Sequence, residues 1–260
     1  MSVDIVIPVL NQLHYTKQCL HNLTENTDNT INIIVINNGS TDGTREYLSS
    51  LNFVTTIDND INLGCAAAWN QGIKAGNSTW VAILNNDVLL PKGWLEGLIE
   101  YADESGVDIA SPGMKGGTCD YDFARYAVDF MKKMSRAART GEAHGVCFMV
   151  RRDIFREIGY FDENFKIGQY EDADFFIRAK SAGFRLAITG RSFIHHFGSV
   201  TQNTLKNDTT TRPYEAENRA YFRKKWKLGW VKRFFLRQQI KLKTFTWRLS
   251  EKFSYGYSLY

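Results

Sequence analysis

The sequence predicts an α/β protein built on a single open, mostly parallel sheet with helices on both faces. Short apolar runs rich in Val and Ile alternate with helix-compatible segments over residues 3–103. Such runs suit strands that are buried on both faces, and their alternation with helices is typical of a parallel sheet. The 260 residues, 43% of them hydrophobic, suffice for one large domain with a sizeable core.

The expected strands and helices follow one another from the start of the chain. Strands are expected at residues 3–10, 31–37, 53–58, 80–90, 145–152 and 185–190, the fourth of them interrupted at residues 85–87. Helices are expected at residues 14–25, 44–51, 62–76, 94–103 and 171–184. Pro91 opens one of these helices, because proline suits the first helical turn. The Gly-rich residues 111–123 are expected to be irregular, residues 124–140 to form a helix or a loop, and residues 192–199 to form a loop.

Charge is divided unevenly along the chain. Residues 223–252 hold eleven Lys or Arg and a single acid, Glu251, so this segment has a net charge of +10 and the remainder has −6. The sequence therefore predicts an acidic body with a basic, aromatic tail, which the overall net charge of +4 conceals.

Cysteine usage and the start of the chain predict a cytoplasmic protein. The four cysteines, which form no CxxC pair, are Cys19, Cys65, Cys119 and Cys147. Scattered cysteines fit a reducing compartment and argue against a structural zinc site. No basic leader precedes the first apolar run, and no run of about 18 apolar residues occurs, so we expect neither a signal peptide nor a membrane-spanning helix.

Polar residues stand where three of the expected strands end. They are Asn11, Asn37–Asn38 and Asn85–Asp87. Ligands of open parallel sheets bind beyond the carboxyl ends of the strands. Turn formation explains one such strand end, but three at one edge favour a ligand site. Asp87 at this place could bind a hard divalent cation that bridges two phosphates.

Acids and histidines add candidate catalytic groups. Glu171, Asp172 and Asp174 crowd the start of an expected helix. The helix dipole explains acids there, but crowding also raises a pKa and can make one carboxylate a base. Of the adjacent His195 and His196, either one binds the same metal as Asp87 or both are structural. The absence of HExxH, GxSxG, Walker A and GxGxxG motifs argues against zinc hydrolases, serine hydrolases, kinases and classical dehydrogenases.

An ordered series of segments resembles the glycosyltransferase family 2 pattern on a GT-A fold, in its rhamnosyltransferase-like form. The segments are DIVIPVLNQ, VINNGSTDGT, NLGCAAAWNQGI, AILNND, GVCFMVRRDIFREIGYFDENF, EDADFFIRAKSAGF, IHHFGS and ENRAYFRKKW. Each is modest alone, but the ordered set is highly specific. The resemblance implies a GT-A domain over residues 1–212, with a nucleotide-sugar half at 1–90 and an acceptor half at 91–212. A helical, basic and aromatic extension follows at 213–260.

The resemblance also implies individual site residues. Asp172 matches the catalytic base, and Glu171 would lie near the acceptor. Asp87 matches the main metal carboxylate, because Asn85 replaces the first Asp of the DxD motif, and His196 matches a further metal ligand. The residues that match nucleotide-sugar contacts are Pro8, Asn11, Asn37, Asn38, Asn62, Gly64, Asn70, Asn86 and Asp87. At Asn37 the family usually has an Asp that pairs with the base, so the identity of the base stays open.

The implied reaction transfers a hexosyl or deoxyhexosyl group, with inversion, from a nucleoside-diphosphate sugar to an acceptor hydroxyl. Mn²⁺ or Mg²⁺ is the implied cofactor. At an ordinary pKa of about 3.9, Asp172 would be ionised at neutral pH. The implied acceptor is a glycan, a glycolipid or an anionic polymer. Basic residues within 111–144 suit an anionic acceptor, although solvated surface charge explains them equally well: Arg125, Lys132, Lys133, Arg136 and Arg139.

Two other functions fit the same pattern. A GT-A nucleotidyltransferase also binds a nucleotide at this sheet edge, but it would not need a base at the position of Asp172. An inactive sugar-nucleotide-binding module is the second alternative, which Asn37 and Asn85 keep open.

The tail has the pattern of a basic amphipathic helix or helix pair. Tyr221, Phe222 and Trp226 are expected to pack on the body. Beyond them, Trp and Phe recur at helical spacing between Lys and Arg, so the apolar face either packs on the body or a second copy of the chain, or contacts an anionic membrane surface at its cytoplasmic side. Nucleic acid would give a similar salt dependence, but aromatic residues at helical spacing favour lipid or protein.

Overall fold

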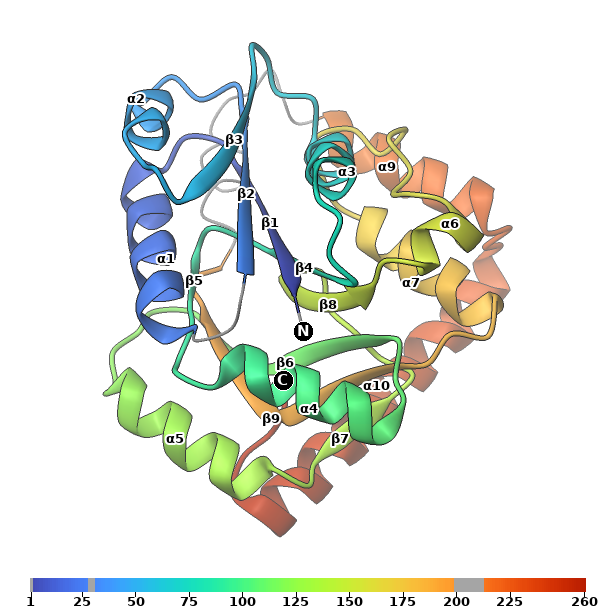
Figure 1. Cartoon of the computed structure of the whole chain (residues 1–260). Coiled ribbons are helices and arrows are strands. Elements are labelled where there is room, and N and C mark those ends of the chain that lie inside the picture. The colour runs from blue at the N-terminus through green and yellow to red at the C-terminus, as the bar shows by residue number, and fades with distance from the viewer. Residues whose placement is uncertain (1, 28–30, 199–212) are drawn as a thin grey trace.

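A nine-stranded sheet forms the centre of the computed structural model, which describes residues 2–27, 31–198 and 213–260 (Figure 1). The strand order is β3-β2-β1-β4-β8-β6-β9-β5, and β7 pairs with β9. The strands are β1 Val3–Val9, β2 Ile31–Asn38, β3 Val54–Asn59, β4 Trp80–Leu84, β5 Val88–Leu89, β6 Ile109–Gly116, β7 Ala138–Thr140, β8 Cys147–Arg151 and β9 Leu186–His196.

The sheet is parallel in its first half and mixed in its second. The strands β3, β2, β1 and β4 run parallel to their neighbours, as the Val- and Ile-rich runs predict. Beyond β4, only the β6–β9 pairing is parallel, so the eight pairings among the described residues comprise four parallel and four antiparallel ones. The expectation of a mostly parallel sheet therefore holds for the first half only, because β8 turns back between β4 and β6.

Helices cover both faces of the sheet (Figure 1). One face packs against α1 Leu13–Asn26, α2 Thr44–Ser49 and α4 Trp94–Ser105 in an apolar cluster that includes Leu23, Leu48 and Trp94. The other face packs against α3 Cys65–Ala75, α6 Ile154–Ile158 and α7 Glu171–Ser181 in a cluster that includes Trp69 and Phe175. A smaller cluster joins α5 Phe123–Met134 to β9.

Two local expectations were wrong. Residues 111–116, which were expected to be irregular, belong to strand β6, because buried neighbours on β8 and β9 outweigh the low strand propensity of Gly and Pro. The expected interruption of the strand 80–90 at residues 85–87, by contrast, is confirmed, and β5 beyond it pairs with β9. Residues 192–196 continue β9 instead of forming a loop.

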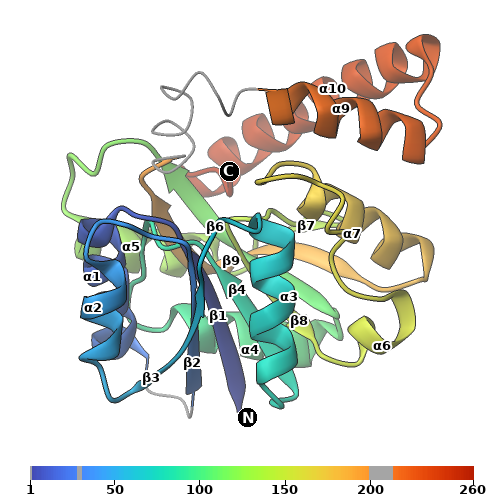
Figure 2. The ribbon, with the colours of Figure 1, turned by 90° about the horizontal axis from the view of Figure 1, so that it is seen from above.

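The basic tail folds into two helices, α9 Pro213–Lys225 and α10 Trp230–Tyr255, which lie outside the layered body (Figure 2). The expected packing of the aromatic residues of α9 is confirmed, because Tyr221 and Phe222 lie 5.1 Å, between ring centroids, from Phe165 and Tyr170 respectively. None of the described helices is long and apolar enough to cross a bilayer.

A buried ion pair fastens α10 to β7. The Arg139 guanidinium donates two hydrogen bonds of 2.7 Å to the Glu251 carboxylate, and the side chains are 3% and 9% exposed. Glu251 also accepts hydrogen bonds from Ser258 and from the backbone N–H of Leu259. The Arg139 guanidinium is therefore buried and bound by Glu251, and the prediction that it contacts an anionic acceptor at the surface is wrong.

We predict that Glu251→Gln destabilises the protein by about 3–5 kcal/mol, because it leaves the Arg139 charge buried without its counter-ion. Urea unfolding would measure this loss. The double variant Arg139→Met/Glu251→Met, which removes both charges, should be closer to wild type than Glu251→Gln. Equal losses in the two variants would contradict the electrostatic explanation.

Candidate active site

A cavity of about 510 Å³ opens at the carboxyl edge of the sheet. Eight of the residues predicted from the sequence line it: Pro8, Asn38, Asn62, Asn86, Asp87, Glu171, Asp172 and His196. They come from the ends of β1, β2, β4 and β9, from the segment before α3 and from the first turn of α7. The parallel first half of the sheet brings three of these strand ends to one edge, as the polar residues there predict.

Asp87 and His196 form the candidate metal pair. Val88 of β5 pairs with His196 of β9, so the residue before β5 lies against the last residue of β9. Asp87 Oδ1 is 3.3 Å from His196 Nε2, and the two side chains are 8% and 13% exposed. Because β9 continues to residue 196, two residues 109 positions apart in the chain present an oxygen and a nitrogen ligand to the same cavity.

The residues before α7 have unusual backbone conformations. Ile167, Gln169 and Tyr170 have φ values of 59°, 80° and 76°, a region that non-glycine residues adopt at a cost. All three line the cavity. The carbonyl of Ile167 accepts a hydrogen bond of 2.7 Å from the N–H of Cys65 at the start of α3. Strained backbone at a cavity wall is a common property of functional sites, and here it directs the first turn of α7 into the cavity.

Glu171 and Asp172 are neighbouring carboxyl groups with different surroundings, the first buried and the second half-buried. Burial, together with the adjacent charge of Asp172, raises the pKa of Glu171 to about 8. Burial also raises the pKa of Asp172, but the Asp172 carboxylate accepts a hydrogen bond of 2.7 Å from the N–H of Ala173, which favours its charged form. Asp172 is thus the ionised member of the pair at neutral pH. Its pKa is not the ordinary one expected from the sequence, and a raised pKa makes it a stronger base.

Gly145 makes room for the Asp172 carboxylate. A Cβ atom added at Gly145 would lie 2.3 Å from Asp172 Oδ2, closer than any real contact. This glycine begins the GVCFMVRR segment that runs into β8. Its missing side chain is therefore a requirement for the position of Asp172.

Asn11 and Asn37 lie behind the cavity wall. Asn11 Oδ1 accepts from the N–H of Thr41 at 2.8 Å, and Asn37 Oδ1 accepts from the N–H of Ser40 at 3.1 Å. Asn37 is fully buried and donates to Asp58 at 2.6 Å. These amides fix the turn after β2, and neither lines the cavity in this conformation.

Amide side chains also fix the turn between β3 and α3. Asn38 donates to Asn62 Oδ1 at 2.8 Å, and the same oxygen accepts from the N–H of Gly64 at 2.9 Å. Gly64 has φ +89°, and an added Cβ would lie 3.0 Å from the backbone nitrogen of Ile167. Gly64 thus supports the strained segment before α7 rather than lining the cavity.

Asn70 does not line the cavity, although the sequence predicted a nucleotide-sugar contact for it. It is 2% exposed, donates to the Phe161 carbonyl and the Glu163 carboxylate at 2.9 and 2.7 Å, and accepts from the Phe161 N–H at 3.0 Å. The hydrogen bonds of the Asn70 amide are therefore made with the segment after α6, which they join to α3, and not in the cavity. We assign Asn70 a structural role in place of the expected donor contact.

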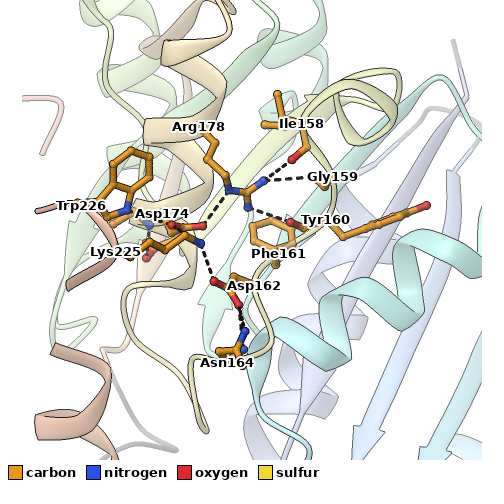
Figure 3. A network of polar contacts seen from close by, with 12 residues as sticks. Ile158, Gly159, Tyr160, Phe161, Asp162, Asn164, Asp174, Arg178, Lys225 and Trp226 are labelled. Carbon is orange, nitrogen blue, oxygen red and sulfur yellow. Dashed lines mark hydrogen bonds and ion pairs between the residues drawn. The ribbon is translucent and has the colours of Figure 1, made fainter. Parts of the chain in front are cut away.

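Asp174 is an anchor rather than a candidate base (Figure 3). It is fully buried and lies 2.9 Å from Arg178 Nε and 2.8 Å from Lys225 Nζ, and it accepts a hydrogen bond of 3.0 Å from the Trp226 indole. Lys225 also pairs with Asp162 at 2.5 Å. This network ties α7 to the end of α9 and holds the helix that carries Glu171 and Asp172.

Asn218 on α9 is a site-supporting residue that the sequence motif contained but did not explain. It is 1% exposed, and its amide donates to the carbonyls of Lys166 and Gly168 at 2.8 Å each. Its Oδ1 accepts from the Lys166 N–H at 2.9 Å. A single side chain therefore satisfies three backbone groups of the strained segment before Glu171.

His195 differs from its neighbour His196. It is fully buried, and its Nδ1 lies 2.8 Å from the hydroxyl of Tyr121. This contact makes His195 structural and leaves His196 as the candidate metal ligand of the pair.

The pair Asp87 and His196 fits Mn²⁺ or Mg²⁺ when a diphosphate supplies further oxygens. Among residues 2–27, 31–198 and 213–260, no three His, Cys, Asp or Glu side chains group together as a metal site. Mg²⁺ normally uses one or two protein carboxylates together with substrate phosphates and water, so two protein ligands suffice for a cation of this kind.

Comparison with known proteins identifies the family. The model of the family "Glycosyl transferase family 2" matches residues 4–159. The chain belongs to glycosyltransferase family 2. Glycosyltransferase AglE of Haloferax volcanii is 28% identical to this family 2 chain over 197 residues, which cover 71% of the chain and 63% of AglE. An uncharacterized glycosyltransferase of Rickettsia typhi is 27% identical over 232 residues, or 82% and 69% of the two proteins.

Solved structures show the same fold. The structure of S. aureus TarS 1-349 matches with a TM-score of 0.61 at 18% identity, over 76% of this family 2 chain and 61% of that one. GalNAc-T7 with UDP, GalNAc and Mn2+ matches with a TM-score of 0.62 at 16% identity, over 75% and 44%. These likenesses confirm the GT-A fold. The chain spans less than two thirds of AglE and of TarS 1-349.

We predict that stability depends on pH through Glu171. Its raised pKa means that the folded protein keeps this proton to a higher pH than the unfolded chain does, so the stability present at pH 4.5 declines as the pH rises through about 8. Glu171→Gln should therefore lose less thermal stability than wild type between pH 5 and pH 8.5. A difference of 1 kcal/mol corresponds to about 2–4 °C in Tm at this size.

The matched control is Glu46→Gln, which changes an exposed glutamate. Its Tm should follow the wild-type pH profile. If Glu171→Gln follows that profile too, Glu171 is not the group responsible.

Proposed function

We propose that this chain is a metal-dependent, inverting glycosyltransferase that moves a hexosyl or deoxyhexosyl group from a nucleoside-diphosphate sugar to an acceptor hydroxyl. The observation that carries the proposal is the convergence of Asp172 with Asp87 and His196 on one cavity at the carboxyl edge of the sheet. Family membership and the fold support the same reaction class.

The solved neighbours support a nucleotide-sugar donor. TarS 1-349 has been solved with UDP-GlcNAc, and GalNAc-T7 has been solved with UDP, GalNAc and Mn2+. In this chain Pro8, Asn38 and Asn62 line the part of the cavity nearest the ends of β1 and β2, where a nucleotide fits the parallel sheet.

Asp172 would act as the general base. Its carboxylate takes the proton from the acceptor hydroxyl, and the oxygen attacks the anomeric carbon while the bond from that carbon to the diphosphate oxygen breaks. Attack from the face opposite the diphosphate inverts the configuration. General-base help of this kind typically contributes about 10²–10⁴ in rate.

Asp87 and His196 would hold Mn²⁺ or Mg²⁺ beside the diphosphate, and the bound cation would neutralise the charge of the leaving group. Glu171 stands next to Asp172 at the start of α7. Because Glu171 is protonated and neutral, it places no second negative charge beside the base. The acceptor half would then present a hydroxyl of a glycan, a glycolipid or an anionic polymer.

We predict a separation between binding and chemistry. With a panel of UDP-, GDP- and dTDP-sugars and Mn²⁺, the wild type should release the nucleoside diphosphate from at least one donor. Asp172→Asn should lower that release by about 10²-fold or more while calorimetry of the nucleoside diphosphate with Mn²⁺ changes little. Asp87→Ala should abolish metal-dependent binding. The control is Asp103→Asn, at an exposed position of α4.

Other outcomes would select the alternatives. Release of pyrophosphate instead of nucleoside diphosphate would indicate a nucleotidyltransferase. Binding without release from any donor would indicate an inactive sugar-nucleotide-binding module. Unchanged turnover of Asp172→Asn would remove Asp172 from the mechanism.

We also propose that α10 contacts an anionic membrane surface. Large apolar side chains along it are exposed, including Trp230 at 74%, Phe245 at 64% and Phe253 at 92%. Its exposed basic residues are Lys232, Arg237, Lys241, Lys243, Arg248 and Lys252, and its only acid, Glu251, is buried. Each Lys or Arg near an anionic surface contributes about 1 kcal/mol, so the helix suits peripheral attachment.

We predict that the full chain sediments with anionic phosphatidylglycerol vesicles at low salt, and less with neutral phosphatidylcholine vesicles or at high salt. The triple variant Phe245→Ser/Leu249→Ser/Phe253→Ser should lose this binding and keep its Tm, because all three residues are exposed. Phe53→Ser is the control, since Phe53 is 46% exposed on the body. Equal sedimentation of the triple variant and wild type would contradict the proposal.

A further inference from the structure

The segment after α10 folds back onto the body. The helix ends at Gly256, which has φ +77° and whose N–H donates to the Lys252 carbonyl at 3.0 Å. Leu259 is fully buried beside α5 and β9. Its N–H donates to Glu251 at 2.9 Å, and its carbonyl accepts from the Met114 N–H of β6 at 2.8 Å. Backbone bonds on both sides of the Leu259 side chain therefore fix the position of the next residue.

That next residue, Tyr260, lines the active-site cavity. Its ring stacks on the His144 ring, with centroids 6.0 Å apart and an angle of 23° between the planes. The Tyr260 carbonyl accepts a hydrogen bond of 2.9 Å from Arg248 Nε. Tyr260 is nevertheless 49% exposed, so it is not a buried core residue. An aromatic ring held in place at a cavity wall is a typical part of a binding site.

His144 links Tyr260 to the candidate base. Its Nε2 lies 2.9 Å from the Pro112 carbonyl, which requires the proton on Nε2 and leaves Nδ1 as an acceptor. Within the described part of the chain, His144 Nδ1 is buried and has no hydrogen-bond partner, although the residue lines the cavity. Gly145 follows directly and packs against Asp172 Oδ2. One continuous wall therefore runs from Tyr260 through His144 and Gly145 to Asp172.

We infer that Tyr260 is the platform for the acceptor, and that its ring stacks on the apolar face of the saccharide that presents the attacking hydroxyl. The inference rests on the proposed transferase function and assigns the acceptor side of its cavity. The Tyr260 wall meets Asp172, the group that must reach the acceptor hydroxyl, whereas the donor residues Pro8 and Asn38 lie at the ends of β1 and β2. A sugar ring has a C–H face that an aromatic ring can cover.

The inference gives α10 a second role. The helix with the exposed basic and apolar surface leads directly into the segment that supplies Tyr260 at the acceptor wall. A saccharide attached to a lipid would thus reach the cavity beside the part of the chain that contacts the lipid surface.

The test places 3-fluorotyrosine at position 260 of the full chain and follows its ¹⁹F resonance. The protein is loaded with UDP and Mg²⁺, which avoids paramagnetic broadening, and titrated with a panel of p-nitrophenyl hexosides and deoxyhexosides. We expect at least one glycoside to shift the signal at 260 in a saturable way. The same label at Tyr160, a 40% exposed residue whose ring stacks on Phe155, should not respond.

Substitution then measures the contribution of the ring. Tyr260→Ala should weaken binding of the responding glycoside about tenfold or more, read as its stimulation of nucleoside-diphosphate release, and Tyr260→Phe should retain it. Release with water as acceptor, and binding of UDP with Mg²⁺, should stay within about twofold of wild type. Tyr160→Ala is the matched control and should leave every readout unchanged.

Two results would overturn the inference. One is a resonance at position 260 that no glycoside in the panel shifts, and the other is a Tyr260→Ala variant with wild-type affinity for a glycoside that stimulates release. If donor release that depends on Asp172 persists in either case, the platform alone has failed. If no donor is cleaved but glycosides still shift the signal at 260, the transferase proposal has failed and the saccharide platform stands.

Discussion

The first turn of α7 must hold two adjacent carboxyl groups at the cavity wall, the buried Glu171 and the half-buried Asp172, and much of the surrounding structure serves that requirement. Two negative charges side by side in this place would be very unfavourable, so Glu171 keeps its proton and Asp172 carries the charge against the helix N–H groups. The positive φ values before the helix, the missing side chain at Gly145 and the amide of Asn218 all keep this turn in place. The anchor around Asp174 then fixes the helix from its other side.

The sequence predicted the ends of the strands better than their pairing. Val- and Ile-rich runs define β1 to β4, and parallel pairing necessarily gathers their polar ends, so Asn38 and Asp87 could be assigned to one edge. The second half of the sheet was harder to predict, because its strand order depends on packing between residues that are far apart in the sequence. Residues such as Gly113, which packs against Phe130, look irregular in the sequence yet lie in a central strand. Asn70 matched the motif, but its hydrogen bonds are made within the protein.

The tail combines features that the sequence showed separately. Its basic and aromatic spacing predicted helices, and both helices are present. No periodic pattern could show that the residues after α10 return to the cavity, because that path depends on one buried ion pair, Arg139 with Glu251, and on the burial of Leu259. Arg139, which the sequence suggested to be a surface charge, thus helps to position the last described residues.

The position of Cys65 against the strained segment 167–170 has a chemical consequence. Burial, together with the nearby acids Glu171 and Asp172, raises the pKa of this thiol, so the nucleophilic thiolate is scarce. Its neighbour Gly168 lies so close that an added Cβ would be 3.2 Å from the sulfur. Cys65 is only partly buried and lines the cavity, so alkylating reagents would reach its sulfur from the cavity. The rate of Cys65 alkylation would therefore report whether a ligand fills the cavity, because a bound ligand would shield the sulfur.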